Sequence, residues 1–157
     1  EANIKGNLKD NKKIKFNNDI IHRSKIIKYF LNDDNNIVKV EKDLKSVYKK
    51  IKRNKKYFIS IMDIIVLESL LSDGVKLPNQ LTFDEISAEL TIPQNLQNLV
   101  NENQLGLVML KIIEIIGEDK VSDLDPETLY FLNKILNQLK LKKIRNEMLS
   151  KVLPIRT

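Results

Sequence analysis

Apolar residues recur at three- and four-residue spacing along most of the chain after residue 18, which is the pattern of amphipathic helices. The first stripe follows the cap residues Asn18 and Asp19 and ends at the turn-forming residues 33–36. Its members are Ile20, Ile21, Ile26, Ile27, Phe30 and Leu31. A second stripe predicts a helix from Glu41 to about Asn54. Its apolar face consists of Val40, Leu44, Val47, Tyr48 and Ile51.

A third helix is predicted to start at the capping box formed by Ser60 and Asp63 and to end at Gly74. Apolar residues cover most of its circumference, which predicts a central position in the fold. Five more helices are expected in the second half of the chain. They span about residues 82–90, 92–102, 104–116, 126–139 and 142–152.

The start and stop signals of these later helices are clear. The sequence Asp125-Pro126-Glu127 combines a good N-cap with a proline tolerated in the first turn and an acid near the positive helix end. Gly117 closes the apolar helix over 104–116, and Pro154 lies just beyond the last helix. Lys140 falls in the short turn between the last two helices.

Seven or eight short helices with short connections predict an all-α fold of consecutive antiparallel hairpins, either solenoid-like or an irregular bundle. Residues 1–17 are expected to form a polar, disordered arm, and residues 18–157 a single helical domain. Within that domain, residues 18–59 are basic and residues 60–157 form an acidic and apolar hairpin part. No run approaches 18 apolar residues, so a soluble protein without a transmembrane segment is predicted.

From Leu105 to Pro154 the predicted hairpins resemble α-solenoid proteins of the tetratricopeptide or HEAT type. The segment from Pro126 to Pro154 has about the length of one tetratricopeptide unit. With Pro154 taken as the terminal proline of that unit, Leu129 falls on a consensus leucine. The resemblance implies a partner-binding scaffold, one form of which is the terminal part of a larger helical-repeat protein. It assigns no individual binding residue.

Charge is sorted into three blocks along the chain. Residues 1–59 carry 17 Lys and Arg against 7 Asp and Glu, residues 60–139 carry 4 against 13, and residues 140–157 carry 6 against 1. The blocks therefore have net charges of +10, −9 and +5, which sum to the +6 of the whole chain. Such sorting indicates either orientation on a charged partner or attraction between the blocks themselves.

Residues suited to catalysis or metal binding are sparse. The chain has no Cys, and its four glycines are isolated, so thiolate chemistry and a phosphate-binding glycine loop are excluded. Its single histidine, His22, is predicted to lie partly exposed at the edge of the first helix.

Two groups of acids invite comparison with ligand sites. Asp119, Asp123, Asp125 and Glu127 alternate as in a calcium loop, but Leu124 stands at the glycine position and Tyr130 at the final glutamate position. Asp84, Glu85 and Glu89 lie at a helix start, where acids are stabilising without any catalytic role. The sequence therefore predicts no enzyme activity, no metal and no cofactor.

The strongest candidate site is a basic segment with interleaved aromatic residues. The candidate partner-binding residues are Lys42, Lys45, Lys49, Lys50, Lys52, Arg53, Lys56 and Tyr57. Four interpretations remain open for it: a nucleic-acid surface, an acidic membrane surface, an acidic protein patch (including the chain's own middle block), or a solvated helix face. The predominance of Lys over Arg favours the last two, because readers of base edges favour Arg.

Together these patterns predict a non-catalytic helical scaffold that binds a protein partner through the basic helix or an exposed Ile and Leu groove. The alternative is a nucleic-acid-binding protein that uses the basic helix around residues 42–58, with Lys140, Lys142, Lys143 and Arg145 as an additional patch.

Overall fold

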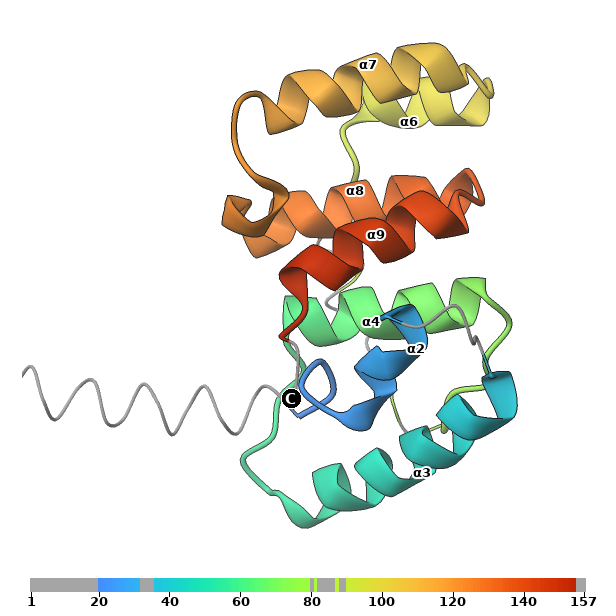
Figure 1. Cartoon of the computed structure of the whole chain (residues 1–157), viewed down its shortest axis with the longest axis vertical. Coiled ribbons are helices and arrows are strands. Elements are labelled where there is room, and N and C mark those ends of the chain that lie inside the picture. Colours follow the sequence, from blue (N-terminus) through green and yellow to red (C-terminus); the bar gives the residue numbers. More distant parts are fainter. Residues whose placement is uncertain (1–19, 32–35, 80, 82–86, 88–89, 155–157) are drawn as a thin grey trace, which may run out of the picture.

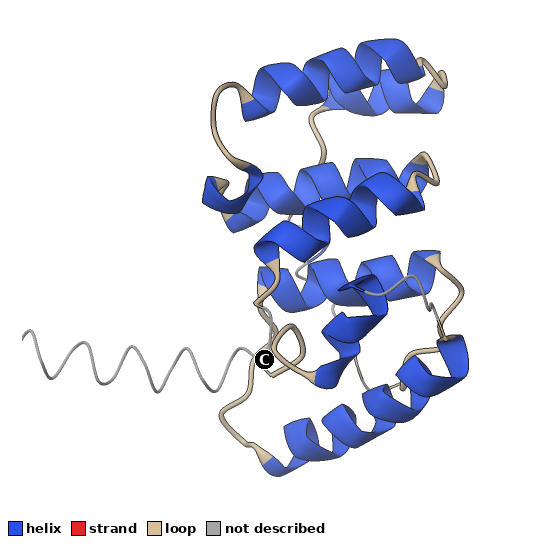
Figure 2. Cartoon of the chain, viewed as in Figure 1, coloured by secondary structure: helices blue, strands red, loops and turns tan. Residues whose placement is uncertain are grey.

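The computed structural model describes residues 20–31, 36–79, 81, 87 and 90–154. In these residues it contains seven α-helices, two 3-10 helices and no strand, which confirms the all-α prediction (Figures 1 and 2). The elements are η1 (Lys25–Ile27), α2 (Lys28–Leu31), α3 (Ile37–Arg53), α4 (Ile61–Ser72), α6 (Gln94–Asn101), α7 (Leu105–Ile116), η2 (Val121–Asp123), α8 (Pro126–Gln138) and α9 (Lys142–Val152). The predicted arm over 1–17 lies outside the described residues. The predicted helix over 82–90 lies largely outside them, since only residues 87 and 90 of that range are described.

The helices form layers whose order differs from their order in the chain. Figure 1 shows the α6–α7 hairpin at one end, the α8–α9 hairpin next to it, then α4 with α2, and α3 at the other end. The most extensive contact between helices joins α4 to α8, and α2 packs on α9. In a solenoid each repeat contacts only its sequence neighbours. Of the two predicted arrangements, the structure therefore matches the irregular bundle, with α6–α7 and α8–α9 as consecutive hairpins.

The centre of the core is α4, as its all-round apolar pattern predicts. Its residues Ile64, Ile65, Val66, Leu67 and Leu70 are all fully buried. Helix α8 covers it with a buried face that consists of Leu129, Tyr130, Leu132, Asn133, Ile135 and Leu136. Because the middle of α4 is buried around its whole circumference, the layers on either side of it share one core.

Three helices end in the same hydrogen-bonded turn, in which a left-handed residue reverses the chain. Gly74 has φ 85° after α4, and the amide of Val75 donates to the carbonyl of Leu70 at 3.0 Å. Asn103 (φ 55°) and Lys140 (φ 58°) take the corresponding position after α6 and α8. These turns make the α6–α7 and α8–α9 hairpins tight, and they confirm the predicted stop at Gly74 and the turn at Lys140.

Two predicted helix starts are wrong. Residues 20–23 form a turn, and the helical segment begins only after Ser24, whose hydroxyl accepts a hydrogen bond from the amide of Ile26 at 3.2 Å. Helix α3 begins at Ile37 instead of Glu41, because the Asn36 side chain accepts from the amide of Lys39 at 3.0 Å and caps the helix four residues earlier.

Two other caps, at Ser60 and Asp125, are where the sequence places them, whereas the helix expected over 92–102 begins at Gln94 without a side-chain cap. The Ser60 side chain accepts from the amide of Asp63 at the start of α4. At the start of α8, the Asp125 carboxylate accepts from the amide and the hydroxyl of Thr128 at 2.9 and 2.8 Å. These hydrogen bonds lower the pKa of Asp125 below its usual value. The acids around Asp125 therefore serve helix entry, as their failed match to a calcium loop indicates.

Candidate functional site

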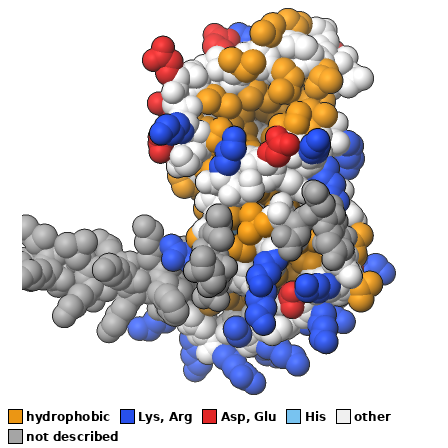
Figure 3. Space-filling view, in the orientation of Figure 1, with side chains coloured by type: hydrophobic (Ala, Val, Ile, Leu, Met, Phe, Trp, Pro, Cys, Tyr) orange, Lys and Arg blue, Asp and Glu red, His pale blue; other side chains and the backbone are white. Residues whose placement is uncertain are grey.

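The basic face of α3 forms one end of the molecule. Helix α3 buries Val40, Leu44 and Val47, and its opposite side is cationic. Exposed cations on this side are Lys39, Lys42, Lys45, Lys49, Lys50, Lys52 and Arg53. We call these seven residues the basic face. Figure 3 shows Lys and Arg side chains gathered over this end.

The structure brings together most of the candidate residues predicted from the sequence, but not all of them. Lys42, Lys45, Lys49, Lys50, Lys52 and Arg53 share the basic face, and Lys56 is exposed just beyond the end of α3. Tyr57 is different: it is half-buried, and its hydroxyl donates to Oδ2 of Asp63 at 3.0 Å. This contact turns its hydroxyl inward, and a role of Tyr57 in the binding surface stays a prediction. Tyr48, expected in the core, is half-buried.

Attraction between the charge blocks is present in the tail and absent from the described part of α3. In the tail, Arg145 and Lys142 pair with Asp73 of the acidic middle block. The structure gives no ion pair between the basic face and an acid within the described residues. The basic face therefore keeps its charge open to solvent, whereas Arg145 is buried and unavailable for the additional patch that the nucleic-acid alternative included.

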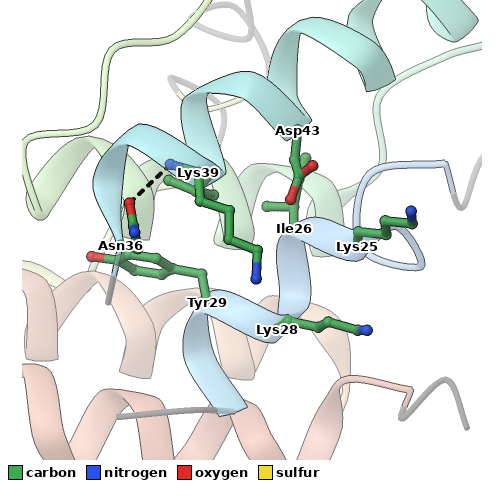
Figure 4. A pocket seen from close by; sticks show the side chains of 8 residues that line it. Lys25, Ile26, Lys28, Tyr29, Asn36, Lys39 and Asp43 are labelled. Carbon is green, nitrogen blue, oxygen red and sulfur yellow. Dashed lines mark hydrogen bonds between the residues drawn. The ribbon is translucent and has the colours of Figure 1, made fainter. Parts of the chain in front are cut away.

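A small cavity of about 270 Å³ lies between the η1–α2 segment and the start of α3. Figure 4 shows Lys39 extending from α3 toward Tyr29, while Lys28 extends away from the cavity. The Tyr29 hydroxyl donates to Oδ2 of Asp73 at 2.8 Å. Burial and this hydrogen bond both raise the pKa of Tyr29, so its hydroxyl stays protonated. The lysines do not converge on one point, and the cavity carries no argument for a catalytic or anion site.

His22 is not the exposed helix-edge residue that the sequence predicts. It is 7% exposed, and its Nδ1 lies 2.7 Å from Oδ1 of Asp63, which also accepts the His22 amide at 2.9 Å. The second carboxylate oxygen accepts from Tyr57. Burial, and then the negative charge of Asp63, raise the pKa of the Tyr57 hydroxyl. This cluster fastens the turn before η1 and the segment after α3 to the first turn of α4, which is a structural role.

A second buried polar cluster joins α4, α8 and α9. Arg145 is 1% exposed and donates two hydrogen bonds to the Asp73 carboxylate, at 2.8 and 2.7 Å. It also donates to the Ser69 carbonyl and to Oδ1 of Asn137. Burial alone would raise the pKa of Asp73, but the hydrogen bonds from Arg145 and Tyr29 hold it below its usual value. We call Arg145 and Asp73 the Arg145 clamp.

The most unusual surface is an apolar face on α7, at the opposite end of the molecule from α3. Only Val108 and Ile112 are buried among the twelve residues of this helix. Its exposed apolar residues are Leu105, Leu107, Leu110, Ile113 and Ile115, with exposed fractions from 44% to 63%. Figure 3 shows apolar side chains gathered at this end. A helix that is apolar all round is normally buried on all sides, so α7 lacks a partner on its outer side.

No protein-family model, no curated protein and no solved structure matches the chain. The resemblance to tetratricopeptide and HEAT proteins accordingly stays a prediction. Within the described residues, no helix is long and apolar enough to cross a membrane, and no three His, Asp or Glu side chains are placed to hold a metal ion.

Proposed function

We propose that the chain is a non-catalytic helical module that binds another protein through the outer side of α7. The observation that carries this proposal is the exposure of Leu107, Leu110 and Ile113, at 49%, 63% and 61%. Apolar side chains gathered on one helix face favour association, because a partner removes them from water at roughly 25 cal/mol per Å². Contiguous apolar patches of a few hundred Å² on soluble proteins commonly mark interaction sites.

The rest of the molecule supports a binding role for this end. The α6–α7 hairpin is stabilised by its own tight turn at Asn103 and stands at the end of the layered bundle, where a partner has free access (Figure 1). The outer residues of α6 are polar, with Gln94 bonded to Asn98 and Gln97 bonded to Asn101. The contact surface is therefore confined to α7.

A photo-reactive amino acid at position 110 tests this proposal in cells that express the protein. Irradiation should yield an adduct of defined mass, because residue 110 lies at the centre of the apolar face. The matched control carries the same probe at Val38, which is even more exposed, at 77%, but lies on α3. The absence of an adduct at position 110, or equal adducts at both positions, would count against the proposal.

A second candidate function is binding to nucleic acid through the basic face. The specific observation is that seven cations lie on one exposed side of a single helix with no ion pair to described acids. Lysine contacts phosphate as a point charge, so this binding would depend little on sequence and would weaken steeply with salt.

Fluorescence anisotropy with a labelled duplex and a labelled single strand separates this candidate from the first. The variant Lys49→Glu/Lys50→Glu/Lys52→Glu/Arg53→Glu should abolish binding that the parent shows at low salt. The control variant changes four exposed lysines outside the basic face and the tail patch and has the same net charge: Lys76→Glu/Lys111→Glu/Lys120→Glu/Lys151→Glu. If both variants bind alike, or the parent fails to bind at low salt, the basic face is not a nucleic-acid site.

A further inference from the structure

The apolar face of α7 is arranged around a single residue. Successive residues of an α-helix are about 100° apart around its axis, which places Leu110 opposite the midpoint of the buried residues Val108 and Ile112. Leu107 and Ile113 lie one turn before and one turn after Leu110 on the same side. By the same geometry Glu114 also lies on this side, about 40° from Leu110. It pairs with Lys111, at the edge of this side, at 2.9 Å. The outer side of α7 is therefore a short apolar ridge with Leu110 at its centre.

Gly106 lies on the same outward side, and the fold itself does not require a glycine there. A Cβ at this position would meet no atom within 4 Å, and its φ is not in the left-handed region. Glycine in a helix is less favourable than alanine, because it loses more conformational freedom on folding. A second helix that crosses this face can approach closely over Gly106, which gives the residue a role that the single chain does not supply.

The two ends of α7 are poorly matched to their own helix dipole. Its first turn contains no acid, and Gln104 makes no side-chain cap hydrogen bond. Its single acid, Glu114, lies instead in the last turn, where a negative charge is unfavourable. An antiparallel second copy of α7 would bring each Glu114 to the uncapped N-terminus of the other helix. A parallel copy would bring the two Glu114 side chains together.

The same antiparallel arrangement matches the apolar ridge to itself. A two-fold axis through Leu110 places Leu110 against its own copy, Leu107 against Ile113 of the second copy, and Gly106 near Glu114 of the second copy. Every apolar residue of the ridge then meets an apolar residue. This self-complementarity of shape and charge is what an isologous interface requires.

We infer that α7 forms the contact of a two-fold symmetric homodimer, with the two α7 helices antiparallel. The inference rests on the proposed function and names the partner as a second copy of the chain. An interface formed by a single helix from each copy is small, and its buried area falls at the low end of the range for specific protein–protein interfaces. The dimer is accordingly reversible, with a dissociation constant in the micromolar range.

Sedimentation equilibrium at protein concentrations below and above the micromolar range tests for the dimer. Leu110→Glu should give a monomer at all concentrations, because two carboxylates would meet at the axis. Glu114→Gln should weaken the dimer between about threefold and thirtyfold, because two charge–dipole contacts are lost. Phe58→Glu is the control, since Phe58 is 57% exposed but lies outside α7, and it should dimerise like the parent. Far-UV circular dichroism checks that each variant is folded.

Cysteine cross-linking tests the orientation, and the absence of native Cys makes it unambiguous. Under mild oxidation, Leu110→Cys should form a disulfide-linked dimer with itself. Leu107→Cys should link efficiently only when it is mixed with Ile113→Cys, whereas a parallel pair would link Leu107→Cys to itself. Phe58→Cys should not link.

The outcomes separate the two proposals. A parent chain that is monomeric throughout, with no link at position 110, overturns the homodimer. The binding proposal then still stands if the photo-reactive probe at position 110 captures a different protein in cells, and it fails if no adduct forms. Efficient linking of Leu107→Cys to itself overturns the antiparallel arrangement.

Discussion

Removal of one side of the Arg145 clamp should destabilise the whole bundle. In Arg145→Met, the Asp73 carboxylate, at 5% side-chain exposure, would keep only the Tyr29 hydroxyl and the Lys142 ammonium group at 3.3 Å. Loss of one partner of a buried ion pair costs about 3–5 kcal/mol, because the remaining charge is left uncompensated. The two remaining partners place the expected loss near the lower end, at about 3 kcal/mol.

Such a loss is large against the total stability of a domain, which is about 5–15 kcal/mol. For a chain of this size it corresponds to a fall of about 10 °C in Tm. Urea denaturation at neutral pH, followed by circular dichroism, measures the change in the free energy of unfolding. The matched control is Lys143→Met, two residues earlier on α9 and exposed, which should change stability by less than about 0.5 kcal/mol.

The effect should also depend on pH in a defined direction. The pKa of Asp73 is held below its usual value in the folded protein. The contribution of Asp73 to stability is therefore complete above the unfolded-state pKa of about 3.9. The contribution is lost as the pH falls through the folded-state pKa, because protonation removes the charge that Arg145 binds. The parent and Arg145→Met should therefore converge in stability at low pH.

Two results would refute this reasoning. One is a loss below about 1 kcal/mol at neutral pH, which would mean that the clamp contributes no more than a surface ion pair. The other is a difference between parent and variant that stays constant through the acid range. A double variant, Asp73→Asn/Arg145→Met, should be more stable than Arg145→Met alone, because it removes the unpaired carboxylate.

Three further substitutions test local features by thermal unfolding. Lys140→Gly should stabilise the protein by about 0.5–1 kcal/mol, since glycine removes the cost of the left-handed backbone; a lower Tm would contradict this. Tyr57→Phe should lower the free energy of unfolding by about 1–3 kcal/mol, because Asp63 loses a buried donor. It should leave the affinity for nucleic acid, measured by anisotropy, unchanged, and an altered affinity would place the Tyr57 hydroxyl in the binding surface. Ser60→Ala should cost about 1 kcal/mol through loss of the α4 cap, and an unchanged Tm would disprove that cap.

The features that could be predicted from the sequence are local ones. The cap at Asp125, the stop at Gly74 and the central position of α4 each depend on residues within a few positions of one another. The late start predicted for α3 shows the limit of apolar periodicity, because the cap at Asn36 adds a first turn in which Ile37, Val38 and Lys39 are exposed and only Val40 is buried.

The two buried polar clusters could not be predicted, because they join residues that are distant in the sequence. His22 and Asp63 are 41 positions apart, and Arg145 and Asp73 are 72 apart. Each pairing depends on the order of the helix layers, which periodicity does not encode. The charge blocks did contain a signal for the second cluster, since Arg145 lies in the basic tail and Asp73 in the acidic middle. They could not indicate which of the tail's cations is buried.

The apolar face of α7 was visible in the sequence only as an unusually apolar helix. Nine large apolar residues in 104–116 are equally compatible with a central helix such as α4, and the sequence alone does not separate the two cases. The difference lies in position: α4 lies between layers, whereas α7 stands at the end of the stack.

The order of the helix layers differs from the order of the helices in the chain, and this difference affects when the core can form during synthesis. Helices α6 and α7 are consecutive in the chain, so the contact between them involves no segment that is synthesised later. Helix α4 ends at Ser72, but its main partner α8 begins only at Pro126. Until α8 emerges, a nascent chain presents the apolar surface of α4 to its surroundings, where it is open to misassembly or to a chaperone. The central contact of the core, between α4 and α8, thus spans the whole intervening hairpin, and contacts of such long sequence separation slow folding.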